Sequence, residues 1–205
     1  MKTVAIVDYG MCNLDSVRRA VEECGGNPVV TDLTEEIEAA THIILPGVGS
    51  FRDGMWNLKQ RSLDSVLREQ VVGRQIPFLG ICLGMQMLAT KGWEGGETDG
   101  LGWIDGEVRK LEPRGEDRRI PHIGWNEVAI TKDSPLFGGM NNGTDFYFVH
   151  SYHFQCQREQ DVLARSSYCG GFVSAIGRGY VFGVQFHPEK SQRAGFQVLR
   201  NFLSL

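Results

Sequence analysis

A single cysteine, Cys82, stands between two glycines directly after a short apolar run, and few local folds accommodate that arrangement. Residues 77–81 (PFLGI) form a run that opens with proline and is typical of a buried strand, while residues 84–90 (GMQMLAT) have the composition of a short helix. Cys82 therefore falls at a switch from strand to helix. A side chain on such a turn points out of the top of a sheet, and Gly80 and Gly84 keep the turn tight, as in a nucleophile elbow of the form GxCxG.

The same cysteine has a second interpretation. Most free cysteines are small core hydrophobes that pack against apolar neighbours and carry out no chemistry. A nucleophile differs from such a residue because it needs a base and a set of oxyanion donors elsewhere in the chain. The elbow pattern alone leaves both interpretations open.

The first half of the chain alternates apolar runs with helical patterns, which predicts a parallel sheet covered on both faces. Residues 13–26 illustrate the helical pattern, because an asparagine precedes the helix, two glycines end it, and Leu14, Val17, Val21 and Cys24 follow helical spacing. The other expected elements are strands within residues 3–10, 28–31, 42–47 and 77–81, and a helical stretch at residues 51–73 with a break near Arg61 and Ser62.

From Gly92 onward the pattern changes to glycine-rich loops and short alternating strands, which predicts antiparallel pairing, and residues 192–205 close the chain as an amphipathic helix. A chain of 205 residues is long enough for one sizeable core, so we expect a single domain spanning residues 1–205. The expected fold class is α/β, a central mostly parallel sheet flanked by helices with an added antiparallel strand region in the C-terminal half. The strands expected in that half are residues 106–112, 122–130, 145–154, 162–168, 172–179 and 180–187.

Composition excludes several classes of function. The net charge is −4 and no basic run is interleaved with aromatic residues, so nucleic acid is not an expected partner. The apolar runs are too short and too glycine-broken to span a bilayer, and no signal-peptide pattern precedes the first strand, so we expect a cytoplasmic protein. The five cysteines are an odd number without a CxxC pair, which predicts neither a disulfide framework nor a zinc site.

A nucleophilic cysteine needs a base that accepts its proton, and the chain offers five histidines. His42 and His122 adjoin apolar strands and are interpreted as structural. His150 and His153 have an HxxH spacing, but a metal site is a weak interpretation because no cysteine or carboxylate accompanies them.

His187 has different neighbours. It stands at the end of the apolar run YVFGVQF, Pro188 stops that run, and Glu189 follows two residues after the histidine. Because proline stiffens the turn, the carboxylate can bond one imidazole nitrogen and leave the other directed at a nucleophile. We therefore expect Cys82, His187 and Glu189 to act together as a catalytic triad.

The oxyanion donors are expected from two backbone segments. One is the N–H of Leu83, the residue after the nucleophile, which lies near a helix N-terminus. The other is the loop LPGVGSF at residues 45–51, where Gly47 and Gly49 allow the amides of Val48 and Gly49 to turn inward or to swing between two orientations. A phosphate-binding turn is the alternative for this loop, but its glycine spacing does not fit the dinucleotide fingerprint.

The motifs GICLGMQ and FHPEKS together resemble those of the class I (triad) glutamine amidotransferases. Further motifs, VDYGMCNL, LPGVGSF, PHIGWN and FYFVHSY, resemble the glutaminase subunits of imidazole glycerol phosphate synthase over essentially the whole chain. The resemblance implies a flavodoxin-like fold and hydrolysis of glutamine through a glutamyl thioester on Cys82. His187 would pass the proton to the leaving ammonia, and Glu189 would orient His187. It implies no cofactor and no metal.

The resemblance also implies a substrate site and a partner. The residues expected to bind glutamine are Gly47, Gly49, Gln86, Glu94, Ser151 and Tyr152. The expected partner is a separate (β/α)8-barrel cyclase subunit that receives the ammonia for histidine biosynthesis, and the residues expected at its docking face are Asn13, Trp125, Tyr147 and Lys190. We expect the PGVG loop to rest with an amide turned away from the oxyanion position and to turn inward only when the cyclase binds its ligand.

Two segments depart from the family pattern. The first turn usually reads DYGxGNL and has Cys12 here in place of the second glycine, and the segment around Glu94 is less acidic than the pattern. Three rival functions remain: an amidotransferase for another acceptor, a cysteine hydrolase or peptidase of similar fold, and a non-catalytic binding module. The PGVG loop disfavours the first, Gln86 with Ser151 and Tyr152 disfavours the second, and the complete triad disfavours the third.

Overall fold

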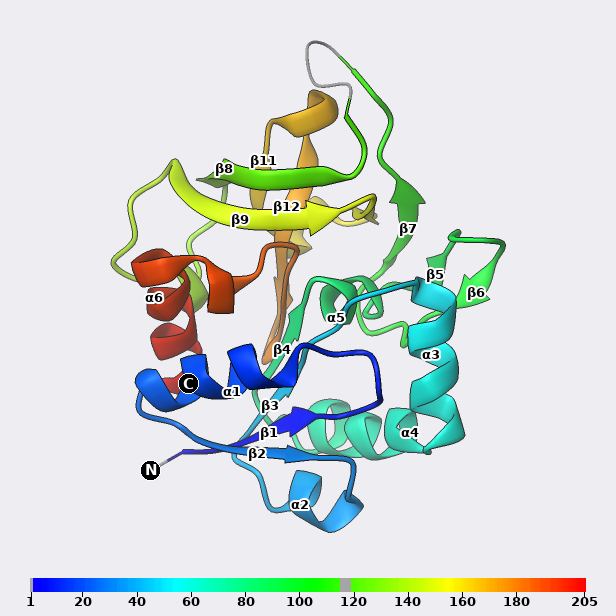
Figure 1. Ribbon diagram of the computed structural model, residues 1–205, viewed down its shortest axis with the longest axis vertical. Helices are drawn as coiled ribbons and strands as arrows, with labels where there is room; N and C mark the ends of the chain where they lie inside the picture. The colour runs from blue at the N-terminus through cyan, green and yellow to red at the C-terminus, as the bar shows by residue number, and fades with distance from the viewer. Residues whose placement is uncertain (1, 115–118) are drawn as a thin grey trace.

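The computed structural model describes residues 2–114 and 119–205. Its centre is a nine-stranded sheet in the order β2-β1-β3-β4-β13-β12-β11-β8-β9, and a four-stranded sheet in the order β10-β7-β5-β6 accompanies it (Figure 1). The strands of the large sheet are β1 Thr3–Val7, β2 Asn27–Thr31, β3 His42–Leu45, β4 Phe78–Ile81, β8 His122–Ile130, β9 Thr144–His150, β11 Val162–Ser166, β12 Phe172–Arg178 and β13 Val181–Val184. Those of the small sheet are β5 Lys91–Gly92, β6 Thr98–Asp99, β7 Gly106–Lys110 and β10 Tyr152–Cys156.

The large sheet is parallel from β2 to β13 and antiparallel from β13 to β9. The α-helices are α1 Leu14–Glu23, α2 Thr34–Glu38, α3 Phe51–Gln60, α4 Leu63–Leu67, α5 Leu83–Gln86 and α6 Gln192–Leu203, with a π-helix η1 at Arg68–Gly73. Short 3-10 turns are η2 Pro135–Phe137, η3 Glu159–Asp161, η4 Tyr168–Gly170 and η5 Pro188–Lys190. The expected α/β class, with an added antiparallel region in the C-terminal half, is confirmed.

Alternating residues of the central strands pack against helices on opposite faces of the sheet. In β1, Val4 and Ile6 belong to a core cluster with α1 and α6, whereas Ala5 and Val7 belong to a second cluster with α2 to α5. Burial on both faces explains why these strands read as continuous apolar runs rather than as alternating ones. Figure 1 shows α1 and α6 on one side of β1, β3 and β4, and α3 and α4 on the other.

Three parallel neighbours end at one edge of the sheet. The register pairs Ile44 of β3 with Leu79 of β4, and Val184 of β13 with Ile81 of β4. The segments that follow these strands must therefore meet at that edge, which is where open α/β sheets bind ligands. The segment after β4 begins with Cys82, and its backbone N–H donates to the carbonyl of Val184 at 2.8 Å.

Several expected elements differ in extent from those observed. Residues 145–154 are not one strand: the chain turns at Ser151 and passes from β9 in the large sheet to β10 in the small sheet. The predicted helix at residues 84–90 is only one turn, α5, and the helix α2 was not predicted. The expected break near Arg61 and Ser62 is confirmed, because α3 ends at Gln60 and Ser62 adopts a left-handed backbone with φ 57°. Among the described residues, no helix combines the length and the apolar character that crossing a membrane requires.

Candidate active site

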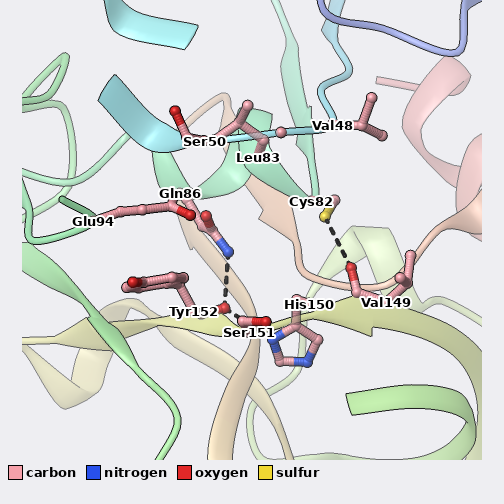
Figure 2. A pocket seen from close by; sticks show the side chains of 11 residues that line it. Val48, Ser50, Cys82, Leu83, Gln86, Glu94, Val149, His150, Ser151 and Tyr152 are labelled. Atoms are coloured by element: carbon pink, nitrogen blue, oxygen red, sulfur yellow. Dashed lines mark hydrogen bonds between the residues drawn. The ribbon is translucent and has the colours of Figure 1, made fainter. Parts of the chain in front are cut away.

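A cavity of about 410 Å³ opens where the segments after β3, β4 and β9 meet (Figure 2). Its lining residues are Val48, Gly49, Ser50, Cys82, Leu83, Gln86, Glu94, Val149, His150, Ser151 and Tyr152. Gln86 lies between Glu94 and Cys82 in the view of Figure 2. The cavity thus combines one thiol, one carboxylate, one amide, one imidazole and three hydroxyl groups, together with backbone groups from separate segments.

Cys82 occupies the strand-to-helix turn that the sequence predicts. Its backbone has φ 53° and ψ −107°, a conformation that costs free energy for a residue with a Cβ and that often occurs at functional sites. The flanking glycines permit the turn: a Cβ on Gly84 would lie 1.8 Å from the carbonyl oxygen of Leu45, and one on Gly80 would lie 2.6 Å from the backbone of Gly84. Cys82 is 7% exposed and is not in a disulfide.

His187 and Glu189 form a buried pair beyond the end of β13. The Nδ1 atom of His187 lies 2.8 Å from Oε1 of Glu189, and the two side chains are 3% and 2% exposed. Burial lowers the pKa of His187, but interactions with the sulfur of Cys82 and the carboxylate of Glu189 outweigh it and raise the pKa to about 10. The other ring nitrogen, Nε2, is buried and makes no hydrogen bond to the described residues. The geometry thus leaves one imidazole nitrogen available to a reacting group.

Two of the three expected oxyanion donors, the amides of Val48 and Leu83, are engaged elsewhere in this conformation. The N–H of Val48 donates to the carbonyl of Met11 at 2.9 Å, and the N–H of Leu83 donates to the carbonyl of Gly47 at 3.4 Å. Gly49 has φ 108°, a backbone conformation that favours glycine. The peptide between Gly47 and Val48 therefore presents its carbonyl toward Leu83 and its N–H away from the cavity.

Cys12 contacts the same loop. Its Sγ donates to the carbonyl of Pro46 at 3.4 Å. Burial raises the pKa of Cys12 to about 11 even though bonding to Tyr9 lowers it, so the thiol stays protonated at neutral pH and can donate. The turn after β1 thus holds the PGVG loop at two points, through Met11 and through Cys12.

Five of the six residues expected to bind substrate line the cavity. They are Gln86, Ser151, Tyr152, Gly49 and Glu94. One carboxylate oxygen of Glu94, Oε2, accepts from the backbone N–H of Phe51 at 2.8 Å, so this residue also binds the start of α3.

Gly47 is the exception among the expected substrate residues, because it does not line the cavity. A Cβ at this position would lie 2.1 Å from the hydroxyl of Tyr9 and 2.9 Å from the side chain of Leu83. Gly47 therefore contributes close packing beneath the loop.

Sequence reasoning missed two side chains of the site. Gln185 is completely buried and its Nε2 lies 3.6 Å from Sγ of Cys82. A glutamine in an otherwise apolar strand was the signal that could have revealed it. His150 lines the cavity, where its Nδ1 donates to the carbonyl of Tyr152 at 2.8 Å and its Nε2 lies 3.1 Å from Nδ1 of His122. In the described part of the chain, no group of three or more His, Cys, Asp or Glu side chains is placed to hold a metal ion.

Three of the four expected docking residues gather on one surface. Trp125 is 48% exposed, its ring centre lies 6.1 Å from that of Tyr147, and Nζ of Lys190 lies 5.9 Å from the Tyr147 ring centre. Asn13 is exposed just before α1. Together Trp125, Tyr147 and Lys190, here called the Trp125 cluster, form an exposed patch that is aromatic and cationic.

Comparisons with known proteins agree on one family. The profile of the family described as Glutamine amidotransferase class-I matches residues 5–204. The HisH subunit of imidazole glycerol phosphate synthase from Moorella thermoacetica is 49% identical over 202 residues, covering 98% of this chain and 94% of the relative. The HisH 1 subunit of the same enzyme from Campylobacter jejuni is 45% identical over 204 residues, covering 98% of this chain and all of the relative (100%).

Solved structures share the fold at lower sequence identity. A crystal structure of a glutamine amidotransferase superposes with a TM-score of 0.76 at 18% identity, covering 98% of this chain and 97% of that chain. The glutaminase domain of Trypanosoma brucei CTPS, with bound acivicin, superposes with a TM-score of 0.68 at 17% identity, covering 100% of this chain and 92% of that chain.

The raised pKa of His187 leads to a first prediction. Replacing Glu189 by glutamine keeps the shape but removes the charge that stabilises the imidazolium, so the pKa of His187 should fall by about 1 to 3 pH units. Titration of isotope-labelled histidine followed by NMR measures this directly. His42 and His153 serve as internal controls, because burial lowers the pKa of each to about 4 and neither contacts Glu189.

The His187–Glu189 pair makes the stability of the fold depend on pH. Because the pKa of His187 is higher in the folded chain than its ordinary value of 6.5, the pair stabilises the fold fully below pH 6.5 and loses this contribution as the pH rises through about 10. The Glu189→Gln chain should lose less stability over that interval than the wild-type chain. An unchanged His187 titration in the variant would contradict the assignment of Glu189 as its charge partner.

Proposed function

This chain belongs to the class-I glutamine amidotransferase family, in its HisH type, and from that premise we propose that it hydrolyses glutamine to glutamate and ammonia for imidazole glycerol phosphate synthase. The observation that carries the proposal is the convergence of Cys82 with the buried His187–Glu189 pair beside one cavity. The ammonia would serve the reaction of a second subunit in histidine biosynthesis. The cytoplasmic location expected from the sequence is part of the same proposal.

The proposed reaction uses the triad as follows. The sulfur of Cys82, having given its proton to His187, attacks the carboxamide carbon of glutamine, and the C–N bond breaks as His187 returns the proton to the departing ammonia. Water then hydrolyses the glutamyl thioester to glutamate and restores the thiol. Glu189 holds the imidazole in one orientation throughout, which the 2.8 Å contact to Nδ1 supports.

The cavity offers complementary groups for the rest of a glutamine molecule. The carboxylate of Glu94 carries the charge that would attract the α-ammonium group, and Gln86, Ser151 and Tyr152 line the space between Glu94 and Cys82. Gly49 forms the wall on the side of the loop. We assign these residues to substrate binding, with Gly47 supporting the loop from behind.

The conformation of the PGVG loop supports a resting state of the enzyme. Rotation of the peptide between Gly47 and Val48 would release the N–H of Leu83 from the Gly47 carbonyl and the N–H of Val48 from Met11. Both donors could then face a developing oxyanion, with Gly49 supplying the backbone freedom. We propose that a liganded partner subunit favours this rotation, so that glutamine is not hydrolysed without an acceptor for the ammonia.

The partner is proposed to be a cyclase subunit built as a (β/α)8 barrel, with ammonia passing through its core. The relatives in Moorella and Campylobacter are named as subunits of imidazole glycerol phosphate synthase, which supports a partner subunit for this chain as well. The Trp125 cluster and Asn13 are the docking residues that we propose. An exposed tryptophan with adjacent tyrosine and a cation is typical of interface anchors.

The principal prediction concerns coupling between the two subunits. The purified chain with glutamine should release glutamate at least about 100-fold more slowly alone than with a liganded cyclase subunit, because an oxyanion donor is missing at rest. Cys82→Ala should abolish release under both conditions. The measurement is glutamate release by each chain, alone and with the cyclase subunit and its nucleotide ligand.

Two outcomes of that assay would redirect the proposal. Full activity of the wild-type chain alone would indicate a free-standing hydrolase. Absence of activity with the liganded cyclase, in a chain that is folded, would favour an amidotransferase for another acceptor or a non-catalytic module.

A further prediction concerns the contact between Cys12 and the loop. Cys12→Ala removes the thiol that donates to Pro46, so the resting loop should be less favoured and the partner-free rate of glutamate release should rise by about 2- to 10-fold. Cys12→Ser, which keeps a donor, should stay near the wild-type rate. Cys24→Ala is the matched control, because the Cys24 thiol donates to a carbonyl, that of Phe196, also at 3.4 Å. If the Cys12→Ala chain releases glutamate without the partner at the same rate as the Cys24→Ala chain, Cys12 does not stabilise the resting loop.

A further inference from the structure

Gln185 is a buried amide next to the nucleophile. It follows the last residue of β13, is completely buried, and lies beside Cys82 because β13 and β4 end in register. Burying a polar amide costs free energy unless its groups are hydrogen-bonded. The partners of the amide oxygen and of the amide nitrogen therefore show how this side chain is oriented.

Hydrogen bonds determine which end of the Gln185 amide faces the sulfur. Nε2 of Gln86 donates to the carbonyl of Tyr152 at 2.9 Å and to Oε1 of Gln185 at 3.0 Å. If the amide of Gln185 were flipped, two NH2 groups would face each other, and if Gln86 were flipped as well, two oxygens would face each other at Tyr152. The network therefore fixes Nε2 of Gln185 toward Sγ of Cys82, at 3.6 Å.

An N–H donor directed at the sulfur favours the thiolate over the thiol. The neutral thiol has another acceptor available, because Sγ lies 3.8 Å from the carbonyl of Val149. The thiolate gains more from an N–H donor than the thiol does, and the gain is larger in a buried site than in water. The His187 imidazolium supplies charge, whereas Gln185 supplies a fixed dipole.

We propose that Gln185 is a catalytic residue that stabilises the thiolate of Cys82 through a hydrogen bond from its Nε2, with Gln86 and Tyr152 fixing the orientation of the amide. The proton of the thiol goes to His187, and Gln185 remains neutral throughout. This inference rests on the proposed function, since it assigns a further residue to the same site.

The test is the pH dependence of Cys82 alkylation. The full chain is treated with iodoacetamide over a range of pH values, and peptide mass spectrometry gives the rate at Cys82 separately from the other four cysteines. Loss of the donor in Gln185→Met should raise the midpoint of this profile by about 1 to 2 pH units. Gln185→Glu preserves the shape and the bond from Gln86 while placing a carboxylate beside the sulfur, so its midpoint should rise further.

Control variants separate a direct effect on the thiol from general loss of packing. Gln70→Met makes the same replacement at a buried glutamine, 1% exposed, that does not line the cavity, and its alkylation midpoint should equal that of the wild type. If Gln185→Met does not fold, as judged by its melting transition, Gln185→Leu decides the test, because it also lacks the N–H donor, whereas the added charge in Gln185→Glu raises the midpoint whatever the role of the amide.

A midpoint at the wild-type value in the folded Gln185 variants would overturn the inference. Because alkylation needs neither glutamine nor a partner, this result would leave the proposed function intact. Conversely, a raised midpoint in a chain whose complex never releases glutamate would support the role of Gln185 toward the sulfur and contradict the proposed function.

Discussion

The parallel alignment of β3, β4 and β13 is the constraint on which the site depends. These strands end at one edge of the sheet, so the loop after Leu45, the turn at Cys82 and the segment carrying His187 meet there although they are far apart in sequence. Hydrogen bonding between the strands fixes their relative height, and the bond from the Cys82 N–H to the Val184 carbonyl extends that register by one residue. A slip of one residue would turn alternate side chains to the other face of the sheet and separate the three groups.

Two features of the site cost free energy, and neighbouring residues offset each of them. The positive φ of Cys82 is tolerated because Gly80 and Gly84 let the neighbouring backbone pack closely around the turn. The charge on a buried His187 is tolerated because Glu189 and Cys82 compensate for desolvation, so each member of the group depends on the others. The loop after β3 is different, since its bonds to Met11 and Cys12 hold one arrangement while Gly49 gives its backbone the freedom for the rotation that we propose.

Much of this organisation could be predicted from the sequence because it is local. The elbow at Cys82, the turn from His187 through Pro188 to Glu189 and the break before α4 each depend on a few adjacent residues. What escaped prediction depends on contacts distant in sequence. Contacts that only the folded chain brings together determine three features. These are the passage from the large to the small sheet at Ser151, the orientation of the Gln185 amide, and the hydrogen bond from Val48 to Met11. The buried position of Gly47 behind the loop was missed for the same reason.

Labelling of the active site shows directly whether Cys82 forms the covalent bond to glutamine. The complex is treated with a diazoketone analogue of glutamine, with and without excess glutamine, and the modified residue is identified by peptide mass spectrometry. If Cys82 is the nucleophile, each chain should carry one label, on Cys82, with loss of glutaminase activity in proportion to labelling and protection by glutamine. Labelling of another residue, or labelling of Cys82 that glutamine does not prevent, would contradict this role of Cys82.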